Sequence, residues 1–133
     1  MAQVRFGVSL DEDVLKELDQ FVLDNHLPNR SQAIRHLVEN RTVDKKWKEN
    51  DVVSGAIVLL FDHHKGDVGV RMKEIQHQFY KEILSAQHFH LDHDNCLEII
   101  AVKGNAYRLT DLANQLIGLK GIIHGKLVTS KMI

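Results

Sequence analysis

The chain of 133 residues has little of three features that would each point to a particular class of protein. It has a single cysteine, which excludes an intramolecular disulfide and any Cys₄ or Cys₂His₂ zinc site built within one chain. It has no excess of one charge, because 17 Lys and Arg stand against 18 Asp and Glu, so a tail that binds by bulk charge is not expected. It also has no apolar run near the roughly 18 residues that cross a bilayer.

The first residues lack the apolar segment of a secretion signal. With a free thiol, this predicts a protein of the reducing cytoplasm that has no membrane partner. Apolar residues still make up 44% of the chain, which is enough to bury a core and too many for a disordered chain. Nine histidines are present, and seven of them lie from His63 onward, which is the first functional clue.

The chain changes character near residues 44–51, which are charged and show no apolar periodicity. This pattern is typical of a helix end that leads into a linker. We therefore expect two domains, residues 1–48 and residues 52–133.

The first domain begins with strict alternation over residues 4–10, which predicts a strand with one buried face. Apolar residues then follow helical spacing over 14–22 and again over 33–38. Asn29 and Gln32 fit a capping box at the start of the second helix. The predicted order is strand, helix, helix.

A lone strand cannot pair with itself, and about 45 residues rarely hold a sufficient core. A homodimer in which the two strands pair antiparallel solves this problem. The solvent face of that ribbon shows Arg5, Gly7 and Ser9 twice, and a two-stranded ribbon fits the DNA major groove. The first-turn amides of the second helix, near Arg30 and Ser31, are placed to hold a phosphate.

These residues resemble a known family. The run Val-Arg-Phe-Gly-Val-Ser-Leu-Asp-Glu-Asp-Val-Leu from Val4 and the run Asn-Arg-Ser-Gln-Ala-Ile-Arg from Asn29 are similar to ribbon-helix-helix repressors. The resemblance implies a dimeric (βαα) domain that binds DNA. The alternative is a dimerisation module that binds no DNA.

The second domain is predicted to have the order βαββαβ, which is ferredoxin-like, so the whole chain is expected to be α+β. The predicted strands are 52–61, 85–91, 96–103 and 122–129, and the predicted helices are 66–84 and 105–119.

A candidate metal site lies on the two middle strands. His88 and His90 are two residues apart and project from one face, while Phe89 and Leu91 are expected to be buried on the other. If the turn spans residues 91–95, Cys96 lies opposite His90 and Glu98 lies opposite His88. Two imidazoles and a thiolate on one face favour a transition metal.

A fourth ligand has to come from elsewhere. His77 lies about 200° round its helix from Ile75, a residue of the core stripe, so it points away from its own core and could meet another subunit. Three nitrogens and a thiolate suit Ni(II) or Cu(II) in a square plane or Zn(II) in a tetrahedron, and spacing does not choose among them. His63, His64 and His93 are candidates for secondary sites.

A second resemblance covers essentially the whole chain. Gln76-His77, followed by His-Phe-His-Leu-Asp-His-Asp-Asn-Cys-Leu-Glu from His88, is similar to the NikR family of nickel-responsive regulators. The resemblance implies a ribbon-helix-helix domain followed by an ACT-like metal domain. It also implies one Ni(II) per subunit, held in a square plane by His88, His90 and Cys96 of one subunit and His77 of a neighbour.

The family further implies a homotetramer, built as a dimer of dimers, that binds a palindromic operator and represses nickel-uptake genes when Ni(II) is bound. Such a protein is not an enzyme, and four filled ligand positions leave no open position for catalysis. The alternative is a ribbon-helix-helix regulator that responds to an amino acid or to another metal. Gln32 and His36 replace acidic residues with which some relatives hold a cation between the domains, which makes that cation site doubtful here.

Overall fold

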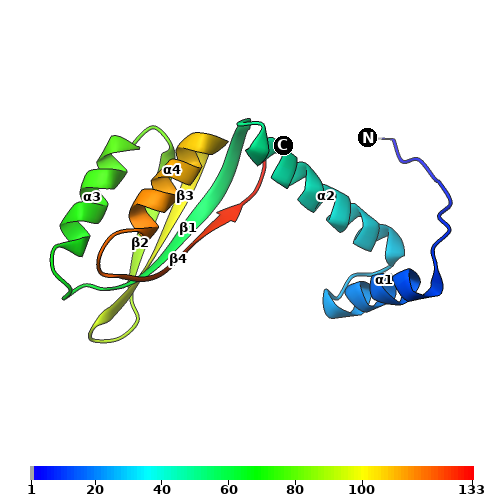
Figure 1. Cartoon of the computed structure of the whole chain (residues 1–133), viewed down its shortest axis with the longest axis horizontal. Coiled ribbons are helices and arrows are strands. Elements are labelled where there is room, and N and C mark those ends of the chain that lie inside the picture. Colours follow the sequence, from blue (N-terminus) through cyan, green and yellow to red (C-terminus); the bar gives the residue numbers. More distant parts are fainter. Residues whose placement is uncertain (1) are drawn as a thin grey trace. The chain divides into compact units, whose positions relative to one another are not determined.

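The computed structural model describes residues 2–133, and its first elements are two helices, α1 (Glu12–Asp24) and α2 (Arg30–Lys48) (Figure 1). Glu12 and Asp13 lie in the first turn of α1, where carboxylates face the positive end of the helix dipole. The Asn29 side chain accepts a hydrogen bond from the Gln32 backbone N–H at 2.9 Å, which caps α2 as the sequence predicts.

The strand predicted over residues 4–10, which was expected to pair with a second chain, is absent from the described single chain. Residues 2–10 form neither helix nor strand, and Val4 and Phe6 are 85% and 72% exposed. The physical reason is that a strand needs a ladder partner, and the described chain pairs no other strand with this segment. The expected strand therefore requires a second chain.

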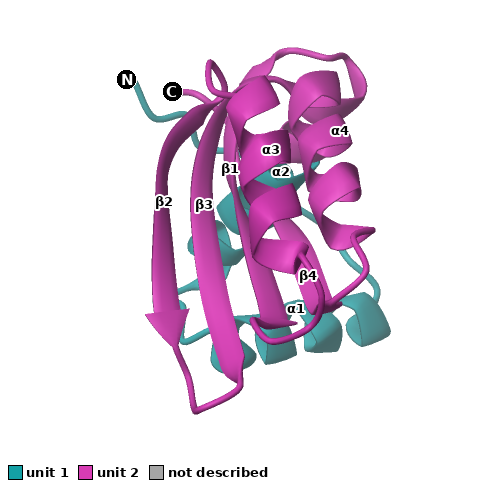
Figure 2. Ribbon diagram, turned by 90° about the vertical axis from the view of Figure 1, so that its left-hand side faces the viewer, with its two compact units in different colours: residues 1–41 teal, residues 42–133 magenta. Residues whose placement is uncertain are grey.

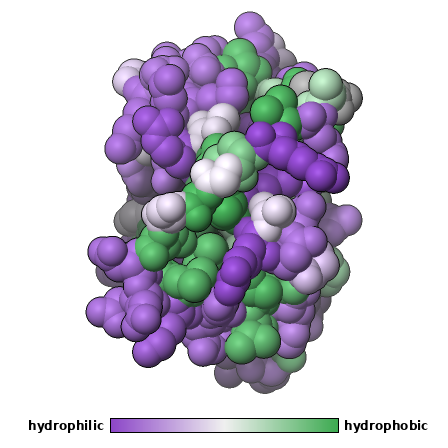
Figure 3. Space-filling view, turned by 90° about the vertical axis from the view of Figure 1, so that its right-hand side faces the viewer, coloured by the Kyte–Doolittle hydropathy of each residue, from purple (hydrophilic) through white to green (hydrophobic). Residues whose placement is uncertain are grey.

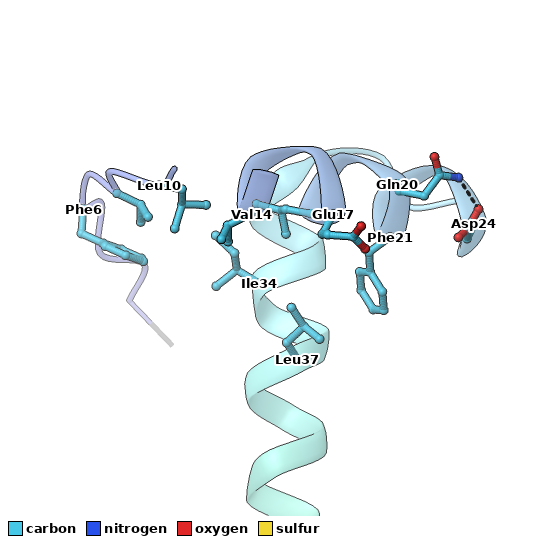
Figure 4. Close-up of a pocket in the computed structure, with 11 residues that line it drawn as sticks. Phe6, Leu10, Val14, Glu17, Gln20, Phe21, Asp24, Ile34 and Leu37 are labelled. Atoms are coloured by element: carbon cyan, nitrogen blue, oxygen red, sulfur yellow. Dashed lines mark hydrogen bonds between the residues drawn. The ribbon is translucent and has the colours of Figure 1, made fainter. Parts of the chain in front are cut away.

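The same segment borders an open apolar groove of about 580 Å³ within residues 1–41 (Figure 4). Phe6 and Leu10 line it from the N-terminal segment, Val14 and Phe21 from α1, and Ile34 from α2. The face of the molecule drawn in Figure 3 likewise shows apolar surface gathered in its middle, between polar margins. The N-terminal unit thus leaves a large part of its apolar surface uncovered.

The chain divides into two compact units, residues 1–41 and residues 42–133, and the division falls within α2 (Figure 2). The second unit contains one four-stranded antiparallel sheet in the order β2-β3-β1-β4, with α3 and α4 on one face. The order βαββαβ is the predicted ferredoxin-like one. Its elements are β1 (Val52–Asp62), α3 (Val68–Gln78), β2 (Ile83–His90), β3 (Asn95–Asn105), α4 (Ala106–Ile117) and β4 (Ile122–Thr129).

The core of this unit lies between the sheet and the two helices. Alternate residues of β1 are fully buried, among them Ile57 and Leu59, and they belong to one cluster with Leu109, Leu112 and Leu116 of α4. Within residues 2–133, no helix is long and apolar enough to cross a membrane.

Helix α3 is shorter than the predicted helix over residues 66–84. It ends at Gln78, and the chain turns through residues 79–82 before β2 begins at Ile83. The apolar residues keep a helical spacing beyond this end for another reason. Phe79 lies in the turn and is buried, and Ile83 lies in β2 and packs against the core. Apolar periodicity alone cannot separate these cases.

The prediction that Phe89 and Leu91 are buried is wrong for the single chain, in which they are 45% and 55% exposed. The cause is that both helices lie on the other face of the sheet, the face that carries Cys96 and the buried residues of β1 (Figure 2). The sheet therefore has an uncovered apolar face.

The close approach of β1 to β4 generates a stability prediction. A Cβ added at Gly55 would lie 2.5 Å from the backbone oxygen of Val128, so Gly55→Ala forces the two strands apart. Gly55→Ala is expected to lower the free energy of unfolding by about 1–3 kcal/mol, measured by urea denaturation at a constant chain concentration. Gly69→Ala is the matched control, because nothing lies within 4 Å of its added Cβ. Equal midpoints for Gly55→Ala and the parent would contradict the prediction.

Candidate metal centre

The register of the β2–β3 hairpin is the predicted one: His90 pairs with Cys96, and His88 pairs with Glu98. The turn between the strands is held by the Asp92 carboxylate, which accepts hydrogen bonds from the Asp94 and Asn95 backbone N–H groups at 2.9 and 2.8 Å. These bonds, the one from Asn95 foremost, lower the pKa of Asp92. A turn of fixed length prevents a one-residue slip, which would move every side chain to the opposite face.

The Cys96 sulfur is the centre of the site. Cys96 is fully buried, and its Sγ lies 3.4 Å from His63 Nδ1 and 3.5 Å from His90 Nδ1. Burial raises the pKa of the Cys96 thiol, and the nearby carboxylates of Asp62, Asp92 and Glu98 raise it further. A metal that binds this sulfur has to displace its proton.

The donor atoms around Cys96 fit a transition metal. One ligand atom from each of His63, His90 and Cys96 lies within 4.8 Å of the other two. Imidazole nitrogen and thiolate sulfur are the ligands that Ni(II), Cu(II) and Zn(II) accept, whereas Mg²⁺ and Ca²⁺ require oxygen.

His63 is the residue that sequence reasoning underrated, since we expected it only at a secondary site. It follows β1 directly, and β1 pairs Phe61 with Cys96 and Asp62 with Asn95. Its backbone N–H donates to the Asp94 carbonyl at 3.2 Å, which holds it beside the hairpin. The β1–β3 register would have revealed this position, but nothing in the local sequence specifies that register.

His88 lies beside this cluster and faces a carboxylate. Its Nδ1 is 3.4 Å from Glu98 Oε1, and its ring centroid is 5.1 Å from that of His90. Gln76 of α3 donates to the other Glu98 oxygen at 2.7 Å. Glu98 therefore links α3 to the strand histidine, as a carboxylate that orients a metal-binding imidazole does.

His77 is exposed on α3, with its ring centroid 6.5 Å from that of Tyr80. It does not belong to the group around Cys96 in the described chain. Contact of His77 with another subunit stays a prediction.

An open groove of about 600 Å³ lies beside the cluster, between α3 and the sheet. His63, His88 and Glu98 line its sheet side, and Met72 and Gln76 line its α3 side.

The candidate DNA contacts lie in the N-terminal unit. Arg5, Gly7 and Ser9 are exposed on the segment without a strand, and Ser31 is exposed in the first turn of α2. The Arg30 guanidinium donates to both carboxylate oxygens of Asp19, at 2.8 and 3.0 Å. This pairing lowers the pKa of Asp19 and occupies the Arg30 side chain.

Comparison with known proteins matches each part of the chain to a protein family. Residues 54–130 match the family model of the NikR C-terminal nickel-binding domain, and residues 4–44 match the model of ribbon-helix-helix proteins of the copG family. A solved structure of an uncharacterized protein from Thermotoga maritima shares the fold, with a TM-score of 0.55 and 15% identity. It covers 61% of this chain and 100% of its own.

Relatives align over nearly the full length. A protein of Syntrophus aciditrophicus is 50% identical over 127 residues, 96% of this chain and 93% of its own. One from Thermococcus kodakarensis is 42% identical over 129 residues, 96% of this chain and 94% of its own. Both names describe proposed nickel-responsive regulators. The chain therefore belongs to the NikR family, whose members are ribbon-helix-helix transcription regulators and not enzymes.

Proposed function

We propose that this chain is a nickel-responsive, DNA-binding transcription regulator of the cytoplasm that represses nickel-uptake genes when Ni(II) is bound. The observation that carries the proposal is the buried Cys96 sulfur with the His90 imidazole within 3.5 Å and His88 on the same face of the hairpin, in a chain that also has a ribbon-helix-helix segment. A thiolate flanked by imidazoles is a donor set for a late first-row metal.

The proposed ligands of one Ni(II) per subunit are His88, His90 and Cys96, together with His77 of a neighbouring subunit. The pairing of His90 with Cys96 and of His88 with Glu98 supports this set, because it gathers the first three on one face of the hairpin. The exposure of His77 on α3 supports the fourth, because an exposed side chain can be shared with another chain. Bound Ni(II) would supply the bond between the two subunits.

The proposed assembly is a homotetramer, a dimer of dimers. The uncovered groove lined by Phe6, Leu10 and Ile34 supports the first contact, because a second ribbon strand would cover it. The uncovered sheet face with Phe89 and Leu91 supports a further contact between metal domains.

The proposed DNA interface is the paired ribbon on a palindromic operator. Arg5, Gly7 and Ser9 would face the major groove, where Arg suits guanine. Ser31 and the first-turn amides of α2 would hold a phosphate. The Asp19 carboxylate keeps the Arg30 side chain bonded within the protein, so the amides, rather than the guanidinium, carry this contact.

The metal-dependent step is a shift between arrangements of the tetramer. His77 lies on α3, and Glu98 links α3 to the hairpin through Gln76, so the position of α3 and the ligand geometry depend on each other. Ni(II) must bind the DNA-competent arrangement more tightly than the others. When one ribbon dimer of the tetramer has bound the operator, the second is held near its half-site. Its high effective concentration there raises the overall affinity for the operator.

A second candidate function is a response to another metal. His63, His90 and Cys96 form a three-ligand group within one chain, and such a group also suits Zn(II). Comparing Ni(II) and Zn(II) in the same DNA-binding titration decides between the two.

The first prediction from the proposed function concerns metal-dependent DNA binding. Ni(II) is expected to tighten binding to a palindromic operator by about 5- to 150-fold at fixed salt, as a coupling of 1–3 kcal/mol requires. The measurement is a fluorescence-anisotropy titration of labelled operator with and without Ni(II), repeated on a scrambled duplex. Equal operator affinity with and without Ni(II) would contradict the proposal.

The second prediction concerns the ribbon. Arg5→Ala is expected to abolish specific operator binding and to leave Ni(II) binding unchanged, because Arg5 lies far along the chain from every proposed ligand. Lys120→Ala removes an exposed charge from the metal domain and is the control, with DNA binding retained. If Arg5→Ala binds operator like the parent, the ribbon assignment is wrong.

The third prediction concerns Glu98 as a positioning residue. Glu98→Gln removes the charge that faces His88 Nδ1, so Ni(II) affinity is expected to fall by about 10- to 100-fold in a competition titration with a chelator. Glu74→Gln alters an exposed carboxylate of α3 and should leave the affinity unchanged. An equal loss in both variants would point to general charge rather than to the contact with His88.

A further inference from the structure

The turn that joins α3 to β2, residues 79–82, is held against α4 by one arginine. The Arg108 guanidinium lies over the Phe79 ring, with its Cζ 4.2 Å from the ring centroid. Its Nε donates to Glu82 Oε1 at 2.8 Å. Phe79 and Glu82 are the first and last residues of the turn, so Arg108 contacts both of its ends. We call this pair of contacts the α4 clamp.

The Glu82 carboxylate makes the turn depend on Arg108. The Glu82 side chain is only 13% exposed, and a Cβ added at Gly104 would lie 3.0 Å from its Cγ. Within residues 2–133, the buried Glu82 Oε2 has no hydrogen-bond partner. A buried carboxylate is costly unless a cation faces it, and Arg108 is the cation that forms an ion pair with this one. Loss of Arg108 would therefore drive the Glu82 side chain toward water and displace the turn.

Backbone hydrogen bonds connect this turn to the last turn of α3. The Phe79 N–H donates to the Gln76 carbonyl at 3.1 Å, and the Tyr80 N–H donates to the His77 carbonyl at 3.4 Å. Within residues 79–82, the Glu82 N–H donates to the Phe79 carbonyl at 3.0 Å. A displacement of the turn therefore moves the carboxyl end of α3, where His77 lies.

The last turn of α3 has a second anchor, on the sheet. The Gln76 side chain donates to Glu98 Oε2 at 2.7 Å, which ties α3 to β3. His77 follows Gln76 directly and so lies between this bond and the α4 clamp. Its own side chain is exposed, so the direction in which the imidazole leaves the helix depends on how the backbone is held at these two points.

We propose that Arg108 is a positioning residue for nickel binding, because the α4 clamp holds His77 where the site of a neighbouring subunit can receive it. The inference rests on the proposed role of His77 as the shared ligand. Arg108 acts at a distance, since Phe79 and Glu82 are not proposed ligands. A ligand that is held in place loses less entropy when the ion binds, so affinity rises without a further bond to the metal.

The first test uses the metal-free chain. Hydrogen exchange followed by mass spectrometry compares the parent with Arg108→Met. The amides of residues 79–83 should exchange faster in the variant, because the turn opens more often, while those of β1 stay protected and show that the domain is folded. Arg71→Met removes an exposed arginine of α3 itself and should exchange like the parent. Unchanged exchange at residues 79–83 in Arg108→Met, or equal acceleration in Arg71→Met, would overturn the inference.

The second test measures Ni(II) affinity of the full, untagged chain by competition with a chelator. Arg108→Met should lower the affinity by about tenfold, as loss of a residue that orients a ligand does. Arg108→Lys keeps the charge without the planar fork and should lose less. In a His77→Ala background, Arg108→Met should lower the affinity by less than about twofold further, because the side chain that it positions is gone. Arg71→Met should bind Ni(II) like the parent.

The outcomes separate this inference from the proposed function. If His77→Ala loses Ni(II) affinity and Arg108→Met does not, the shared nickel site stands and the positioning role is wrong. If Arg108→Met costs the same with and without His77, it acts on the domain in general, which also overturns the inference. If His77→Ala binds Ni(II) like the parent, the proposed shared ligand is wrong, and the role of Arg108 is wrong with it.

Discussion

The pairing of β3 with both of its neighbours at Cys96 is the constraint on which the site depends. Phe61 of β1 and His90 of β2 both pair with Cys96, so this residue lies between two strands and under the helices. Backbone ladders on both sides prevent a slip of register. The imidazoles of His63, in the turn after β1, and of His90 on β2 reach the sulfur because β1 and β2 are fixed on either side of it.

Burial of the thiol has a chemical consequence. A buried thiol surrounded by carboxylates keeps its proton, and its raised pKa favours the neutral form in the absence of a cation. The His90 imidazole at 3.5 Å offers a nitrogen ligand beside the sulfur, so a metal ion is the natural replacement for that proton.

Each of the two units also leaves an apolar surface uncovered. In the first unit the groove beside Phe6 and Leu10 is open, and in the second unit one sheet face leaves Phe89 and Leu91 exposed. Surfaces of this kind mark contacts with other chains. The proposed sharing of His77 between subunits is consistent with a chain whose units are incomplete alone, and it would make metal binding depend on assembly.

Much of the fold and the register of the β2–β3 hairpin could be predicted from sequence. The βαββαβ order, the cap at Asn29 and the pairing of His90 with Cys96 follow from local periodicity and turn length, which are short-range properties. The end of α3 at Gln78 could not be predicted, because Phe79 and Ile83 are buried from a turn and a strand at helical spacing. The strand at residues 4–10, predicted to pair with a second chain, does not form in the described single chain, because no strand of that chain pairs with it.

The amino-acid sequence by itself determined which donor atoms are available, the spacing of His88 and His90 on one strand face, and the resemblance that identified the family. Only the tertiary structure decided that His63 lies against Cys96, that Arg30 is bonded to Asp19, and that His64 meets Asp94. The reason is that these contacts depend on the register of strands and the packing of helices that are distant in sequence, and local patterns carry no information about either.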